Sequence, residues 1–305
     1  MIKTITSHKI KKVQRGVALI QVLLISSLIS ILAISFSFTA RNQVKMARAF
    51  EQRTSATQLL KSVQNKVIYT LLTQNIFDKS INVFPESERW NFYGQPFVLE
   101  QSKDVKIIAQ IQDNSGLLSQ QLIHTPMWNK VFKGLGLSEE QIKQKQGEIS
   151  DWQDQDTNSW IIGSKELSTL NNGQLYRNQP IQLSQEIAWF FSQEPKIINL
   201  IQAISTHLLS IRFNPMNAPA PLLRLLLEQD VADEIIRLRS NNTLTAQEMI
   251  TMLGNSFDSD YMYLYRGSNL KITIYVELNT VQLQETIEIK LQPDKTLPII
   301  ILSRY

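Results

Sequence analysis

The hydrophobic pattern begins with a long uncharged segment. Residues 17–40 contain no charged side chain, and neither Gly nor Pro occurs between Val17 and Leu72. The 24 residues of 17–40 make a helix of about 36 Å at about 1.5 Å per residue. A bilayer core of about 30 Å needs roughly 20 such residues. The segment is therefore long enough to cross a membrane.

Beyond Arg41 the pattern becomes amphipathic. Polar residues separate the apolar residues of this segment. From Leu59 on, the apolar residues are four positions apart, at Leu59, Val63, Val67 and Leu71. This spacing places them on one face of a helix. The pattern predicts one continuous helix from Val17 to Leu72, membrane-embedded in its first half and amphipathic in its second. Two helices with a break near Arg41 are the alternative.

The rest of the chain predicts strands at both ends and helices between them, which indicates an α+β fold. Alternation and β-branched residues predict strands at 90–99, 105–111, 271–278 and 284–291, with 298–302 as a candidate fifth. Helices are expected at 139–152, 183–191, 197–209, 220–227, 231–239 and 246–252. A helical block therefore interrupts a strand-rich module.

Positive charge precedes the apolar segment. The first sixteen residues hold five Lys or Arg and no acid, and they end in Gly16 directly before Val17. An ordinary secretory signal has its cleavage site after the apolar segment, whereas a cut after Gly16 would keep that segment. An uncleaved signal anchor is the alternative. Basic residues before the span favour a cytoplasmic leader and an external chain. The positive charges of Arg41, Lys45 and Arg48 on the far side weaken that orientation slightly.

The junction resembles a known N-terminus. Arg15-Gly16-Val17-Ala18-Leu19, followed by Val22-Leu23-Leu24, is similar to type IV pilins and pseudopilins, which implies cleavage between Gly16 and Val17 by a prepilin peptidase, with prepilin methylation. Most members carry Glu at the fifth mature position, where this chain has Gln21. The general secretion pathway protein K family of minor pseudopilins characteristically lacks that Glu. It is also the largest pseudopilin class, which suits a chain of 305 residues.

Four internal phrases resemble the same family. They are the turn 113–119, the acidic tryptophan segment 151–156, the segment 175–181 with Glu186, and the Asn/Pro turn 214–219. The resemblance implies a long transmembrane and spine helix, and a pilin-like antiparallel β-sheet with a large inserted α-helical domain. The expected divisions are a leader at 1–16, a span at 17–40, helix continuation and first strands at 41–112, the insert at 113–255 and final strands at 256–305.

One acidic cluster is a candidate metal site. Asp151, Asp154, Asp156 and Asn158 supply hard oxygen donors of the kind that calcium takes, and Glu166 adds a carboxylate from beyond the loop. Ser159 stands where an EF-hand has Gly, so the loop is not of that type. A solvated acidic turn is the alternative. The resemblance implies calcium in the helical domain; one ion is expected, because 160–167 lacks further acidic residues apart from Glu166.

Composition excludes several function classes. The net charge of +4 becomes −1 without the leader, so nucleic-acid binding has no electrostatic support. There is no Cys, the three histidines are scattered, and no phosphate-binding Gly-rich loop or nucleophile elbow is present. The sequence predicts a protein that acts by assembly and is not an enzyme.

The resulting expectation is a minor pseudopilin that caps the pseudopilus tip of a type II secretion machine. It would cross the inner membrane once, with the bulk of the chain periplasmic. Expected partners are other minor pseudopilins, the prepilin peptidase, and secreted substrates or the outer-membrane secretin. A neutral Gln21 avoids an unpaired charge in lipid, which suits a subunit with no neighbour above it. The alternatives are a minor pilin of a type IV pilus and a signal-anchored periplasmic enzyme or receptor.

Overall fold

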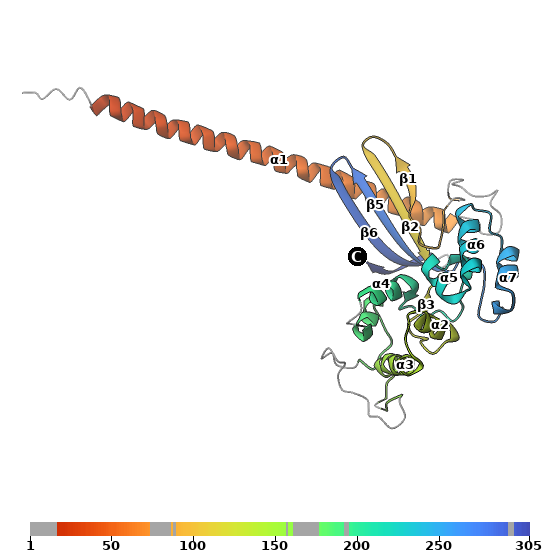
Figure 1. The fold of residues 1–305 in the computed structure, drawn as a ribbon. Helices are drawn as coiled ribbons and strands as arrows, with labels where there is room; N and C mark the ends of the chain where they lie inside the picture. Colours follow the sequence, from red (N-terminus) through yellow and green to blue (C-terminus); the bar gives the residue numbers. More distant parts are fainter. Residues whose placement is uncertain are drawn as a thin grey trace, which may run out of the picture. The chain divides into compact units, whose positions relative to one another are not determined.

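The computed structural model describes residues 17–73, 87, 90–156, 158–160, 177–191, 195–291 and 296–305. A long helix, an antiparallel sheet and a set of further helices make a pilin-like α+β fold (Figure 1). The chain forms two compact units, Met1–Thr57 and Gln58–Tyr305. Each unit is described below by itself.

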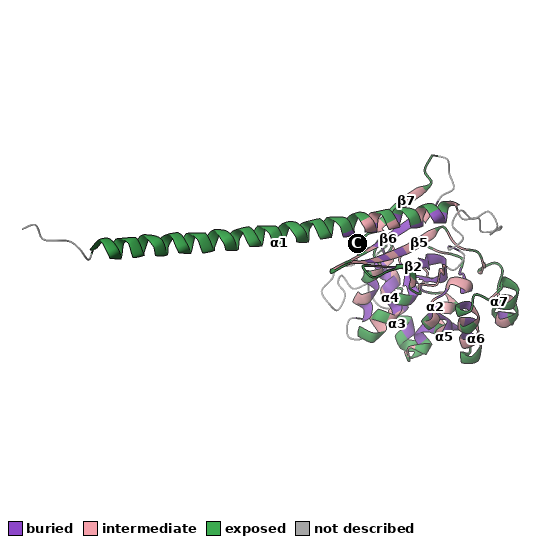
Figure 2. Ribbon diagram, turned by 90° about the horizontal axis from the view of Figure 1, so that it is seen from above, coloured by how far each residue is buried: buried purple, intermediate pink, exposed green. Residues whose placement is uncertain are grey.

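Helix α1 runs without interruption from Val17 to Thr73, over 57 residues. The continuous helix of the sequence pattern is confirmed, and the alternative break near Arg41 is wrong. By length and composition this helix is able to cross a membrane. Its apolar half is exposed along its length (Figure 2). Four hydroxyl groups in that half, those of Ser26, Ser27, Ser30 and Thr39, donate to carbonyl oxygens about one turn back in the helix, which pairs these polar groups within the helix.

The sheet of the second unit has five strands, β1 Phe97–Gln101, β2 Val105–Asp113, β5 Asn269–Leu278, β6 Val281–Leu291 and β7 Ile299–Arg304. Their order is β1-β2-β5-β6-β7, and every neighbouring pair is antiparallel. The prediction placed the first strand too early, at residue 90. Gly94 has a φ of +76° and turns the chain, so regular pairing begins only at Phe97.

The final part of α1 covers this sheet. Leu60, Val67 and Leu71 are buried in one apolar cluster with the alternate residues of the central strand, Leu270, Ile272, Ile274 and Val276. Alternation on β5 sends every second side chain toward the helix. At the edge of this cluster Lys61 Nζ lies 2.6 Å from a carboxylate oxygen of Glu285 on β6. The four-residue stripe predicted for the helix is thus its packed face.

In the part of the chain that the structure describes, the α-helices after α1 all come between β2 and β5 in sequence, and these two strands are neighbours in the sheet. These helices form a second apolar cluster, centred on residues such as Trp128, Phe132, Trp152, Ile201 and Leu222. In chain order the elements are η3 Asn114–Gly116, β3 Leu118–Ser119, α2 Pro126–Gly134, α3 Glu139–Gln153, η4 Ser184–Phe191, α4 Pro195–Ile204, β4 Ser205–Thr206, η5 Pro215–Asn217, α5 Ala220–Leu226, α6 Gln229–Ser240, α7 Ala246–Leu253 and η6 Gly254–Ser256. This block is called the insert below.

Three features of the insert differ from the sequence prediction. Helix α2 was not predicted, because its nine residues are too few for a clear period. The segment 184–191 is a 3₁₀ helix where an α-helix was expected. The helix expected to reach residue 209 ends at Ile204, because Ser205 and Thr206 pair in parallel with Leu118 and Ser119.

One buried carboxylate joins the insert to the sheet. Asp113, at the end of β2, is fully buried. Its Oδ1 accepts a hydrogen bond from the Ser115 amide at 2.9 Å. Its Oδ2 accepts from Asn217 Nδ2 and from the Gly267 amide, each at 2.8 Å. The carboxylate therefore holds the exit from β2, the turn at η5 and the entry to β5 at one point, and these contacts are called the Asp113 junction.

Close packing supports the Asp113 junction. A Cβ atom placed on Gly116 would lie 2.2 Å from the Asn217 carbonyl oxygen, so only glycine fits there. The two turn phrases of the sequence, 113–119 and 214–219, are therefore in direct contact. Nearby, Arg239 Nη1 donates to the Ala218 oxygen at 2.6 Å, and its guanidinium lies 4.2 Å from the ring centre of Tyr93. Burial lowers the pKa of Arg239 to about 10.

Replacing the Asp113 carboxylate tests this junction. In D113N the side-chain NH₂ group replaces one of the two acceptor oxygens. At least one of the backbone N–H groups of Ser115 and Gly267 then lacks its acceptor. We expect the free energy of unfolding to fall by about 1–3 kcal/mol, the cost of a buried unsatisfied group. Chemical denaturation of the full chain in detergent measures it. The control D260N, at an exposed aspartate, should change stability by less than about 0.5 kcal/mol; an equal effect of both variants would contradict the role of Asp113.

Candidate functional site

The first candidate site is the start of α1. Val17 is the first residue of the helix, and Gly16 lies outside the described residues. Gln21, five positions along from the expected cut, is exposed within the apolar half of the helix. A neutral side chain there carries no charge that lipid would have to accommodate. By length and composition, the helix that begins at Val17 is able to cross a membrane.

The second candidate site is the acidic loop at the end of α3. Asp151 is buried, and both its oxygens have partners. Oδ1 accepts a hydrogen bond from the Trp160 amide at 2.8 Å, and Oδ2 accepts one from Ser159 Oγ at 3.1 Å. Asp151 thus closes the loop onto the end of its own helix.

The other two aspartates of the loop are bound more loosely. Asp154 ends α3 as its C-cap residue, and its Oδ1 atom is buried without a hydrogen-bond partner among the described residues. Partial burial, then the neighbouring carboxylates of Asp156 and Asp151, raise the pKa of Asp154. Asp156 Oδ1 accepts from the Asn158 amide at 2.7 Å. Repulsion between like charges is the local condition that a cation would relieve.

These carboxylates fit calcium as donors but do not complete a site alone. Within the described part of the chain, no three acidic or histidine side chains come together closely enough to hold a metal ion. Glu166, the fourth predicted ligand, lies outside the described residues. The unpartnered oxygen of Asp154 is the observation that favours a cation at this loop.

The acidic tryptophan phrase also forms a buried hydrogen-bond cluster. Glu186, only 1% exposed, accepts from Trp152 Nε1 at 3.1 Å and from Arg177 Nη1 at 2.8 Å. The amides of Gln182 and Leu183 donate to the same carboxylate at 3.1 and 3.0 Å. Two phrases singled out separately in the sequence therefore meet. Their contact could not be read from spacing, because it depends on tertiary packing.

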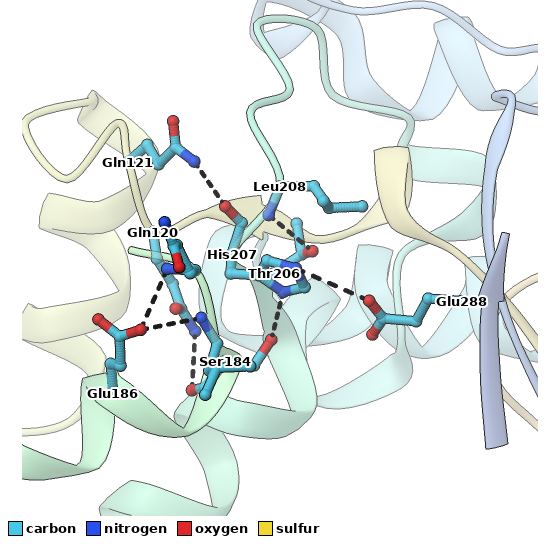
Figure 3. Close-up of polar contacts among 10 residues, drawn as sticks. Gln120, Gln121, Ser184, Glu186, Thr206, His207, Leu208 and Glu288 are labelled. Carbon is cyan, nitrogen blue, oxygen red and sulfur yellow. Dashed lines mark hydrogen bonds and ion pairs between the residues drawn. The ribbon is translucent and has the colours of Figure 1, made fainter. Parts of the chain in front are cut away.

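A third polar cluster lies between the insert and β6 (Figure 3). Ser184 Oγ lies 3.1 Å from His207 Nδ1, and the other ring nitrogen lies 3.8 Å from Glu288 Oε2. That Glu288 atom is buried and has no hydrogen-bond partner among the described residues. Gln121 Nε2 donates to the His207 carbonyl oxygen at 2.7 Å. Sequence analysis missed this cluster because its members are far apart in the chain.

An apolar cleft of about 670 Å³ opens on the insert. Residues of 117–128, 210–213 and 258–262 line it. His124, one of the lining residues, stacks on Trp160, with ring centres 4.1 Å apart, and its Nε2 lies 2.7 Å from Ser150 Oγ. Burial lowers the pKa of His124. Neither Ser184, His207 nor Glu288 lines this cleft.

Comparison with known proteins adds one structural likeness. No protein-family model matches the chain, and no curated protein matches its sequence. Among solved structures it is similar to a chain in the crystal structure of the GspK-GspI-GspJ complex from the type 2 secretion system of enterotoxigenic Escherichia coli. The TM-score is 0.59 at 11% identity, over 85% of this chain and 98% of that chain. The two chains share a fold.

Two buried glutamates allow a matched test of the polar clusters. E186Q replaces a carboxylate that accepts four hydrogen bonds, so we expect the free energy of unfolding to fall by about 1.5–3 kcal/mol. E288Q neutralises a buried carboxylate whose Oε2 atom lacks a hydrogen-bond partner among the described residues, so we expect a loss below about 1 kcal/mol or a gain. Denaturant melts at neutral pH compare them. A larger loss in E288Q than in E186Q would contradict this assignment.

Proposed function

We propose that this chain is a minor pseudopilin of a type II secretion machine, of the general secretion pathway protein K family, and that it caps the pseudopilus tip. One observation carries the proposal. A block of helices enters a pilin-like sheet between two neighbouring strands, β2 and β5, while the final part of α1 covers the same sheet. The likeness to a chain of the GspK-GspI-GspJ complex supports it.

The N-terminal segment would anchor the protein in the inner membrane. A prepilin peptidase would cut between Gly16 and Val17, and α1 would then cross the membrane once with the bulk of the chain in the periplasm. The basic leader and the uncharged span support this orientation.

The tip position would follow from two features. Gln21 offers no charge to pair with the amine of a subunit above it, and the insert adds bulk to a sheet that other subunits would need to approach. The partners would be other minor pseudopilins, and the insert would face secreted substrates or the secretin.

Action by assembly fits the clusters better than catalysis does. Of the clusters described above, one resembles the catalytic triad of a hydrolase. It consists of Ser184, His207 and Glu288. However, the separation of 3.8 Å between His207 and Glu288 is too long for a hydrogen bond. None of the three residues lines the apolar cleft described above. Their positions suit a contact between the insert and the sheet.

One calcium ion at the acidic loop would stabilise the insert. Asp151, Asp154, Asp156 and Glu166 would hold it. The ion would supply positive charge to a cluster in which partial burial, and then the neighbouring carboxylates, raise the pKa of Asp154. Because this carboxylate binds protons more readily when folded, its own contribution to stability falls as pH rises through its titration range, and calcium would offset that loss.

Co-purification tests the proposed function. We expect the full chain, expressed with the other minor pseudopilins, to be extracted with them as a complex of defined size. The chain expressed alone should not polymerise, because its insert and Gln21 disfavour stacking. A filament made of this chain alone would contradict the capping role.

Processing tests the leader. Replacing Gly16 with Leu should leave the chain at full length in cells that contain a prepilin peptidase, whereas the parent should begin at Val17. The control Gln14→Leu adds bulk two residues upstream and should be processed normally. N-terminal sequencing of membrane-extracted protein gives the result, and an unprocessed parent would favour a plain signal anchor.

Calcium removal tests the acidic loop. At a hundredfold excess over its dissociation constant, one ion adds about 2.7 kcal/mol to the free energy of unfolding, or roughly 5–10 °C in melting temperature for a unit of this size. Melts in calcium and in chelator measure the difference, which D154A and D156A should abolish. The exposed D260N is the control. Equal melting midpoints of the parent in calcium and in chelator would contradict the calcium site and favour the alternative of a solvated acidic turn.

A further inference from the structure

A stripe of positive charge follows the apolar half of α1. Arg41, Lys45 and Arg48 are spaced four and three positions apart, which places them on one side of the helix. All three side chains are exposed. Among the described residues none of them makes an ion pair. The first acidic residue of the helix, Glu51, comes only after the stripe.

The position of the stripe matches the headgroup layer of a bilayer. Arg41 follows directly on Ala40, the last residue of the apolar segment. From Arg41 to Arg48 the helix rises about 10 Å, at about 1.5 Å per residue. The polar layer on each side of the hydrocarbon core is roughly 5–8 Å thick, and long basic side chains reach back toward it.

The opposite side of the same helix segment, called the apolar side below, carries two large exposed apolar side chains, with Gln43 beside them. Phe50 lies about two and a half turns after Arg41, and it is 75% exposed. Met46 is 72% exposed and lies on the same apolar side. A partner helix would pack on Met46 and Phe50, because burying apolar surface is favourable. That packing turns the basic side away from the partner and toward lipid.

We propose that Arg41, Lys45 and Arg48 bind the phosphate groups of anionic phospholipids in the leaflet at the C-terminal end of the span. The proposal rests on the membrane anchoring proposed above. Positive residues on this side of a span oppose the usual charge distribution, and binding anionic lipid gives them a role. The contacts fix how deeply α1 sits and hold the apolar side toward neighbouring subunits.

Native mass spectrometry of the full chain in detergent tests the stripe. Phosphatidylglycerol and phosphatidylcholine of equal chain length are added in turn, and bound lipid is counted. We expect the parent to prefer phosphatidylglycerol, with a preference that falls about fivefold for each charge removed. The variant R41Q/K45Q/R48Q should bind both lipids equally. Raising salt toward 1 M should weaken the parent's preference, because the screening length falls to about 3 Å.

A charge-matched variant is the control. K103Q/K143Q/K196Q removes the same charge from exposed lysines of the second unit and should keep the parent's preference. Loss in both variants, or in neither, would overturn the stripe as the binding surface. The proposal would also be overturned if R41Q/K45Q/R48Q lost its co-purifying pseudopilins but kept the lipid preference. That result would mean that the stripe binds carboxylates of a partner protein. Carbonate extraction of membranes tests the membrane anchoring separately. Release of the chain by carbonate would contradict the proposed anchoring, whichever lipid the chain binds.

Discussion

The fold depends on one buried carboxylate, that of Asp113. A chain that inserts a second apolar core between neighbouring strands must fix the two points where it leaves and re-enters the sheet, called the crossings here. At each crossing the strand pairing stops and exposes backbone polar groups that need hydrogen-bond partners. Asp113 accepts hydrogen bonds from both crossings and from the turn at Asn217. Gly116 allows the two turns to touch. With this point fixed, the strands β2 and β5 remain paired although the whole insert separates them in sequence.

Two apolar clusters then serve different purposes. The first, between α1 and the sheet, builds the module that pilin-like proteins share. The second lies inside the insert and packs around Trp128 and Trp152. The carboxylate oxygens of Glu186 all accept hydrogen bonds. At Glu288, by contrast, the Oε2 atom has no hydrogen-bond partner among the described residues.

Much of this architecture was predictable because its signals are local. The absence of Gly and Pro from 17–72 gave the continuous helix, and alternation gave the last strands. Helix α2 is too short for its period to show. The first strand began late because Gly94 turns the chain. The contacts Trp152–Glu186 and Asp113–Asn217 depend on tertiary packing, which spacing does not encode. The calcium ligands stay a prediction, since Glu166 lies outside the described residues.

The position of the protein in an assembled pseudopilus tests the account most directly. The chain has no cysteine, so one introduced at the exposed Lys143 of the insert carries a single gold label. Electron microscopy of pseudopili made with the labelled protein should show gold at one end only. Label distributed along the shaft, or filaments that never contain it, would contradict the account.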